Sequence, residues 1–137
     1  MANVSATDLP VEDISRLLAL VGQPARIQIL FVISEQAACV CHLEAALGMR
    51  QAGISQHLMA LRKANLVSPC REGRNIFYRL ERPEVVTLLR QAARLAGIPP
   101  EGLEHLASRP VQGCPCPQCN PEVDLAQSCA NLHPKPH

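Results

Sequence analysis

The spacing of the apolar residues is the feature that most limits how this chain can fold. Between residues 11 and 97, apolar side chains recur every three or four positions, as on one face of a helix, except between Val67 and Leu80. In that stretch the period changes to two around residues 72–74, which predicts a β-hairpin with glycine at its tip. Pro69 cannot donate to a strand ladder, so the first strand of the hairpin is predicted to be an edge strand.

The helical spacing predicts five main helices. They cover residues 11–21, a segment that begins at Pro24, and residues 41–47, 50–64 and 83–96, with a further short turn around residues 103–107. Two of them are joined at Gly48 and are followed directly by the hairpin. This order is typical of a winged helix-turn-helix, so the predicted fold class is mainly α with a small β-hairpin.

Composition divides the chain into four parts. Residues 1–10 are predicted to be a flexible arm, residues 11–97 the winged helix-turn-helix domain, and residues 98–108 a short helical extension. Residues 109–137 hold six of the twelve prolines and four of the seven cysteines, which predicts a tail that builds no apolar core of its own.

Charge is concentrated in the middle of the chain. The whole chain has a net charge of only +1, but residues 50–82 carry seven Lys or Arg against two Asp or Glu. Such a basic block is typical of a face that meets an anion, most often nucleic acid. With two Phe, one Tyr and no Trp, a module that stacks bases on aromatic side chains is disfavoured. Reading of a DNA groove by a polar helix is the predicted mode.

The helix predicted over residues 50–64 presents polar side chains opposite its apolar face. Gln51 and Gln56 are able to read adenine edges, and Ser55 to reach a base or a phosphate. Phosphate contacts are predicted from Arg62, Lys63, Arg71 and Arg74. His57 lies near the apolar edge of the helix, so two interpretations stay open: contact with DNA, or packing inside the protein.

The seven cysteines are many for 137 residues. The first ten residues are polar and show no secretory signal, and no segment approaches the roughly 20 apolar residues that span a bilayer. A cytoplasmic protein without membrane contact is therefore expected. In a reducing compartment, clustered thiols indicate metal binding or redox sensing rather than structural disulfides.

Several stretches resemble the ArsR/SmtB family of metal-responsive repressors. The similar stretches are residues 22–27, 39–43, 51–58, 61–67 and 71–80. The resemblance implies a homodimer that pairs through its first and last helices. It also implies that the dimer binds a palindromic double-stranded operator until an inducer releases it.

Cys39-Val40-Cys41 is similar to the cysteine pair of the family's arsenic-, cadmium- and lead-sensing branch. Two sulfurs on one ion lie at most ~4.6 Å apart if each is roughly 2.3 Å from it. Residues two apart in a regular helix point about 200° from each other. We therefore expect the helix to unwind locally when an ion binds, so that the helix that reads DNA is poorly placed.

The sequence departs from the family pattern beyond this pair. Glu44 or Ala45 stands where some arsenic sensors have a third cysteine, and residues 1–38 contain no cysteine, although cadmium sensors of the branch add thiols from that arm. The Asp/His set that zinc, nickel and cobalt sensors carry on the last helix is missing between residues 84 and 96. A further ligand must then come from elsewhere, unless two thiols suffice.

The tail offers three further thiols, Cys114, Cys116 and Cys119. One or two of them are predicted to join Cys39 and Cys41, from the same or the other subunit, while a self-contained tail site is the rival arrangement. Thiolates select soft ions, so the candidate inducers are As(III), Sb(III), Cd(II) and Pb(II), with Zn(II) also possible for a thiolate site. Cys70 and Cys129 are interpreted as bystanders.

Two alternatives keep the thiols but change the function. In the first, the same DNA-binding fold senses oxidants or reactive sulfur through Cys41 and a tail thiol. In the second, Cys116 and Cys119 form the C-x-x-C pair of a thiol–disulfide oxidoreductase. Such an enzyme needs the pair at a helix amino terminus in a βαβ setting, and the Pro-rich tail predicts neither. The chain is therefore expected not to be an enzyme.

Overall fold

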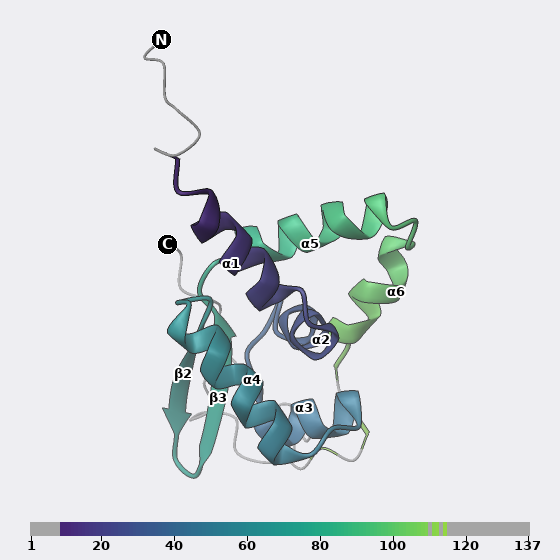
Figure 1. The fold of residues 1–137 in the computed structure, drawn as a ribbon. Helices are drawn as coiled ribbons and strands as arrows, with labels where there is room; N and C mark the ends of the chain where they lie inside the picture. Colours follow the sequence, from purple (N-terminus) through teal and green to yellow (C-terminus); the bar gives the residue numbers. More distant parts are fainter. Residues whose placement is uncertain (1–8, 110, 113, 115–137) are drawn as a thin grey trace.

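The computed structural model describes residues 9–109, 111, 112 and 114. Its elements in chain order are α1 (Val11–Val21), α2 (Pro24–Val32), β1 (Ala38–Cys39), α3 (Val40–Leu47), α4 (Gln51–Lys63), β2 (Val67–Glu72), β3 (Asn75–Leu80), α5 (Glu84–Leu95), α6 (Pro100–Glu104) and the 3₁₀ helix η2 (His105–Ala107) (Figure 1). This confirms the predicted class, a mainly helical winged helix-turn-helix with a small hairpin.

Each of the two helices of the helix-turn-helix is followed by a residue with a left-handed backbone conformation. Gly48 has φ of 65° and closes α3 through its amide, which donates to the carbonyl of Glu44. Asn65 follows α4 with φ of 60°, and the next amide, of Leu66, donates back to the carbonyl of Leu61 over 3.0 Å. Bonds of this kind satisfy the last carbonyls of a helix and turn the chain away from its axis. The chain therefore leaves α4 directly into β2.

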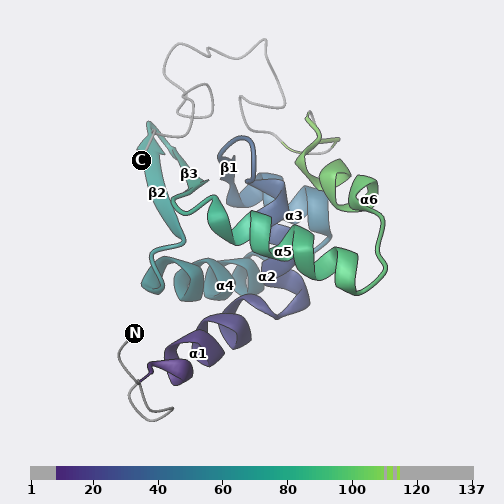
Figure 2. The same cartoon turned by 90° about the horizontal axis from the view of Figure 1, so that it is seen from above.

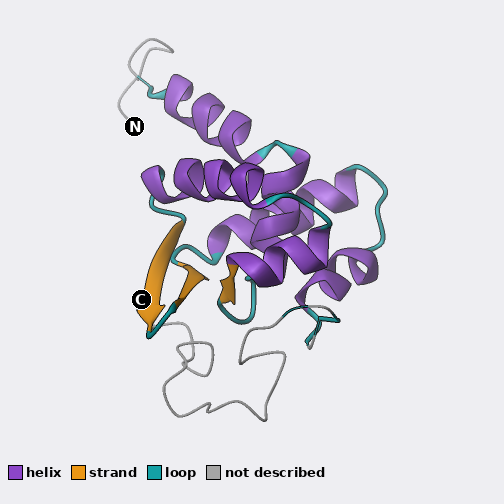
Figure 3. Cartoon of the chain, turned by 90° about the horizontal axis from the view of Figure 1, so that it is seen from below, coloured by secondary structure: helices purple, strands orange, loops and turns teal. Residues whose placement is uncertain are grey.

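The hairpin belongs to a three-stranded antiparallel sheet in the order β1-β3-β2. Gly73 has φ of 58° and occupies the first of the two positions between the strands, where tight hairpin turns need a positive φ. β2 lies at an edge of the sheet, which confirms the expectation from Pro69. β1 was not predicted. Figures 2 and 3 show the strands on one side of the molecule and α6 on the other.

One apolar core joins α2, α3, α4, the strands and α5. Its fully buried members include Leu30, Phe31, Leu43, Ile54 and Leu58. Burying side chains of this size contributes roughly 1.5–3 kcal/mol each, relative to exposure. The core therefore fixes α4 against α2 and α3, which positions its opposite, polar face at the surface.

α1 and α5 keep apolar surface outside that core. α1 lies at the outer edge of the molecule in Figure 2, and its buried residue is Val21. Exposed apolar side chains of the two helices include Val11, Ile14, Leu18, Leu88 and Leu95. In the described part of the chain, no helix has both the length and the apolar character to cross a bilayer.

Candidate metal centre and DNA-binding surface

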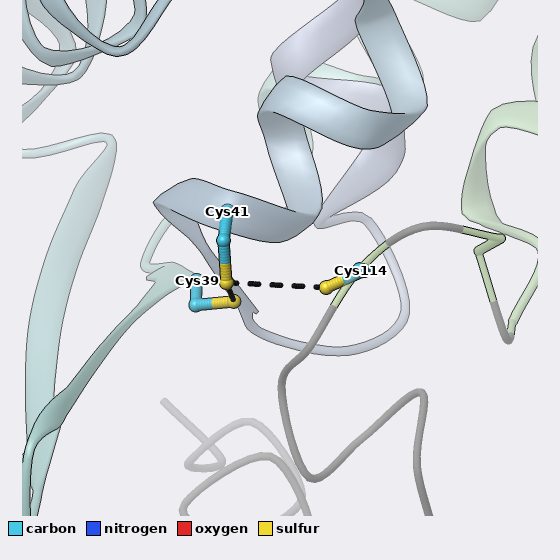
Figure 4. A group of neighbouring side chains, drawn as sticks. All are labelled: Cys39, Cys41 and Cys114. Carbon is cyan, nitrogen blue, oxygen red and sulfur yellow. Dashed lines mark hydrogen bonds between the residues drawn. The ribbon is translucent and has the colours of Figure 1, made fainter.

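Three thiols meet at one point of the structure. Cys39 Sγ lies 2.7 Å from Cys41 Sγ, Cys41 Sγ lies 3.9 Å from Cys114 Sγ, and all three sulfurs are within 4.8 Å of one another (Figure 4). Within the described residues, this group contains neither histidine nor carboxylate. The structure thus brings the predicted pair together with one predicted tail thiol of the same chain. Cys116 and Cys119 lie outside the described residues.

The backbone before α3 explains how two cysteines so close in sequence face one point. Cys39 is the last residue of β1 and the N-cap of α3, with φ of −82° and ψ of 165°, while Cys41 is in the first helical turn. An extended N-cap residue does not follow the helical rotation of about 100° per residue. The expectation that the helix must unwind is therefore wrong, because the sulfurs already converge on an intact helix.

The surroundings of the sulfurs are mostly apolar. Cys39 is 3% and Cys114 5% exposed, and both pack with Ala37 and Phe77 in a small apolar cluster. The amide of His42 donates to Cys39 Sγ over 3.3 Å. Amides at a helix amino terminus stabilise negative charge, so this end of α3 is suited to hold a thiolate. Cys41 is half-buried, so two of the three sulfurs belong to buried residues and the third is partly open to solvent.

The sheet connects this cluster to the wing, by which we mean the hairpin β2–β3. Cys39 is in register with Phe77 of β3, and Phe77 is in register with Cys70 of β2. Register partners in an antiparallel sheet project from the same face and interact. Cys70 packs, half-buried, against the thiol cluster. Its interpretation as a bystander has no structural test, but it is a neighbour of the site.

The positions predicted to contact DNA are at the surface. On α4, the buried residues Ile54, Leu58 and Leu61 face the core. The exposed predicted positions are Gln51, Ser55, Gln56, Arg62 and Lys63 on α4, with Arg71 and Arg74 on the wing. Gln51 is the first residue of α4, where side chains reach base edges in helix-turn-helix proteins. Accessibility is what these contacts require, and the contacts themselves stay predictions.

His57 is the exception on α4, because it is half-buried and faces α2. Arg26 donates from Nε to His57 Nδ1 over 3.1 Å and from Nη1 to the carbonyl of Leu20 over 3.0 Å. Burial and, second, the Arg26 charge lower the pKa of His57. The neutral ring accepts at Nδ1, so its proton is on Nε2. Arg26, which sequence reasoning did not single out, thus ties α4 to α2 and to the end of α1.

Comparison with known proteins places these features in a family. The model of the family "Bacterial regulatory protein, arsR family" matches residues 23–68. The chain is 33% identical over 91 residues to the biofilm growth-associated repressor of Agrobacterium fabrum, which covers 66% of this chain and 78% of that protein. It is 30% identical over 82 residues to a transcriptional repressor SmtB homolog of Synechocystis, covering 60% of this chain and 62% of the relative.

A solved structure agrees with the sequence matches. NolR from Sinorhizobium fredii superposes with a TM-score of 0.61 at 28% identity, covering 72% of this chain and all of that one. The sequence match includes α3 and α4, whereas Cys114 lies beyond residue 68, where the family match ends. The family match therefore bears on the DNA-binding part, and the third thiol is interpreted from its own geometry.

Proposed function

Because the chain belongs to the ArsR/SmtB family of bacterial transcriptional repressors, we propose that it represses an operator until As(III) or Sb(III) binds Cys39, Cys41 and Cys114. The observation that carries this proposal is the convergence of three sulfurs at the start of the helix-turn-helix. The family consists of DNA-binding regulators rather than enzymes. An oxidoreductase function for Cys116 and Cys119 is accordingly not supported.

Charge balance favours a trivalent ion in this site. Three thiolates neutralise As(III) or Sb(III), whereas with Cd(II), Pb(II) or Zn(II) they leave a net charge of minus one. An unpaired charge is costly in a largely buried, apolar cluster such as the one around Phe77. Zn(II) also prefers four ligands. The described group supplies three, which would suit an ion that takes three thiolates, as As(III) and Sb(III) would.

The three thiols replace the three hydroxyls of arsenous acid, As(OH)₃. Each S–H gives its proton to a departing hydroxide, so three As–S bonds form, three As–O bonds break and three waters leave. Neither oxidation nor reduction takes place. The sulfurs already lie within 4.8 Å of one another, close to the ~4.6 Å limit for one ion, so they need to move little.

The position of the site supports an effect on DNA binding. β1 pairs with the wing strand β3, α3 packs against α4, and Cys114 belongs to the tail. An ion that joins the three sulfurs restrains these segments relative to one another. We propose that the restrained arrangement binds DNA more weakly, so that the ion shifts the population by its differential affinity.

We further propose a homodimer formed by the exposed apolar faces of α1 and α5. Val11, Ile14 and Leu18 lie on α1, while Leu88 and Leu95 lie on α5, and all five are exposed in the single chain. Apolar side chains exposed on two helices are suited to burial against a second copy. A two-fold dimer presents two α4 helices to a palindromic operator. We place this repressor in the cytoplasm, where its thiols stay reduced.

A redox signal is the second candidate function, because Cys114 Sγ lies only 3.9 Å from Cys41 Sγ. A peroxide would oxidise the two thiols to one disulfide and be reduced to water, with both thiol protons ending in water. Exposure of metal-free protein to peroxide or to As(III) separates the candidates. Release of DNA by peroxide together with no response to As(III) would replace the metalloid proposal.

The proposed site is tested by titrating reduced protein with As(III), Sb(III), Cd(II), Pb(II) and Zn(II) and following thiolate absorption. We expect one As(III) per chain, bound by three sulfurs, and two As–S bonds in Cys114→Ser by X-ray absorption. Cys116→Ser and Cys119→Ser are the matched controls from the same tail. Unchanged binding in Cys114→Ser, with loss in either control, would move the third ligand to another tail thiol.

A further inference from the structure

Arg109 holds the start of the tail against the body of the domain. Its Nη2 donates to the carbonyl of Val32 over 2.8 Å and to that of Gln36 over 3.4 Å. Its Nη1 donates to the carbonyls of Ala107 and Ser108 over 2.9 and 3.4 Å. One half-buried guanidinium thus joins residues more than 70 positions apart in the sequence.

The backbone carbonyl of Val32, which accepts the shortest of these hydrogen bonds, is suited to bind a cation. Val32 is the last residue of α2, and the carbonyls at a helix carboxyl end carry partial negative charge and lack helical partners. The neighbouring carbonyls of Ile29 and Phe31 accept from the amides of Ile33 and Ser34. The guanidinium supplies the donor for Val32, so its bond satisfies the helix end as well as fixing the tail.

The two segments that Arg109 joins are each followed in the sequence by a thiol of the site. Gln36 is followed by β1 and Cys39, while Arg109 precedes Cys114 by five residues. Five residues reach at most about 17–18 Å when fully extended. With Arg109 bound to α2, the Cys114 thiol stays within that reach of Arg109, and it lies beside Cys39 and Cys41. A tethered ligand acts at a high effective concentration, which raises affinity without a new contact to the ion.

We propose that Arg109 is a positioning residue for the third thiol. Its bonds to Val32 and Gln36 place Cys114 against Cys39 and Cys41, and it lies outside the group of ligand atoms. This inference rests on the proposed function for its effect on As(III) affinity. The placement of Cys114 does not, because it exists without an ion and is measured without one.

The ion-free test is alkylation of Cys114. In the reduced wild-type protein, the buried thiol should react slowly with iodoacetamide, with mass spectrometry resolving Cys114 from Cys116 and Cys119. Arg109→Ala should raise the rate about tenfold, since a charge-assisted hydrogen bond changes an equilibrium constant by about that factor or more. Arg109→Lys, which keeps one donor for Val32, should fall between. Arg94→Ala removes an exposed charge elsewhere and should leave the rate unchanged.

The ion-binding test is a double-mutant cycle. Arg109→Ala should weaken As(III) binding about tenfold in the wild-type background and have little effect in Cys114→Ser, because it acts only through that thiol. An equal loss in both backgrounds, or an unchanged alkylation rate in Arg109→Ala, would overturn the positioning role. If wild-type protein does not bind As(III) but alkylation responds as expected, the proposed inducer is wrong while the role of Arg109 stands.

Discussion

Cys39 of β1 and Phe77 of β3 are register partners, so a proposed ligand and a wing residue share one row of the sheet. Phe77 is fully buried, and its other register partner is Cys70 on β2. A shift of Cys39 on ion binding therefore acts first on the side chain at the centre of this row. The thiol site thus contacts the wing directly, because β1, which carries Cys39, pairs with the wing strand β3.

Replacing Phe77 by Leu should uncouple ion binding from DNA binding. The smaller side chain leaves the ligands in place but packs less tightly between Cys39 and Cys70. The coupling free energy between ion binding and DNA binding, typically 1–3 kcal/mol in allosteric proteins, should therefore fall. The stability loss should be smaller than the roughly 3–5 kcal/mol of truncation to Ala. Operator affinity measured with and without As(III) gives the coupling.

Phe31→Leu is the matched control for that variant, because Phe31 is equally buried but belongs to the main core. It should lose comparable stability and keep the wild-type coupling. Equal coupling in Phe77→Leu and wild type would show that the sheet does not carry the signal.

The fold could be predicted because its elements are long enough to show a period. The hairpin appears as alternation around Gly73, and α4 as the spacing of four and then three residues between Ile54, Leu58 and Leu61. β1 has two residues and shows no period, so the extended conformation of Cys39 was missed. That omission led directly to the wrong expectation that α3 must unwind.

The thiol site was only partly predictable for a different reason. Tail thiols were candidates, but nothing local selects Cys114, since it lies 73 residues from Cys41 and the approach depends on tertiary contacts. Arg109 left no signal either, because its partners are backbone carbonyls, which every residue has. The residue types predicted a site made of thiolates. Tertiary packing determines which of the thiols form it.

The bond between Arg26 and His57 predicts how stability depends on pH. The folded protein lowers the pKa of His57 below its ordinary value of about 6.5, first through burial and second through Arg26. Between the two values the unfolded chain binds more protons, so stability is complete above about pH 6.5 and declines as pH falls toward the folded pKa. Urea unfolding at a series of pH values from 5 to 8 measures this change in the free energy of unfolding.

His57→Asn keeps a hydrogen-bond acceptor and removes the titration. Relative to this variant, the wild-type protein should gain stability as pH rises to about 7 and then stay level. A relative stability that grows as pH falls would contradict the neutral form of His57.

Two surface variants should distinguish residues that contact bases from residues that contact phosphates. Gln51→Ala should weaken binding to an operator selected from random DNA by about 1–3 kcal/mol and leave non-specific DNA unchanged. Arg74→Ala should weaken binding to both and reduce the slope of log affinity against log salt by about 1. Fluorescence anisotropy over a salt series distinguishes them. Equal losses on both DNAs for Gln51→Ala would remove it from the base contacts.

Trivalent and divalent ions should differ in their proton balance. Exchange of three thiols for the hydroxyls of As(OH)₃ releases water and no protons, whereas Cd(II) displaces up to three thiol protons. As(III) affinity should therefore change little with pH, whereas Cd(II) affinity should rise steeply as the pH rises. Calorimetry in buffers of different ionisation enthalpy counts the protons. Equal proton release by the two ions would argue against three protonated thiols as ligands.

An ion bound at Cys39, Cys41 and Cys114 is proposed to weaken DNA binding. The direct measurement is operator affinity of reduced protein as As(III) is added, for wild type and Cys41→Ser. We predict that wild type releases the operator at one As(III) per chain, while Cys41→Ser binds it equally well with and without As(III). A Cys41→Ser protein that releases operator like wild type would contradict the assignment.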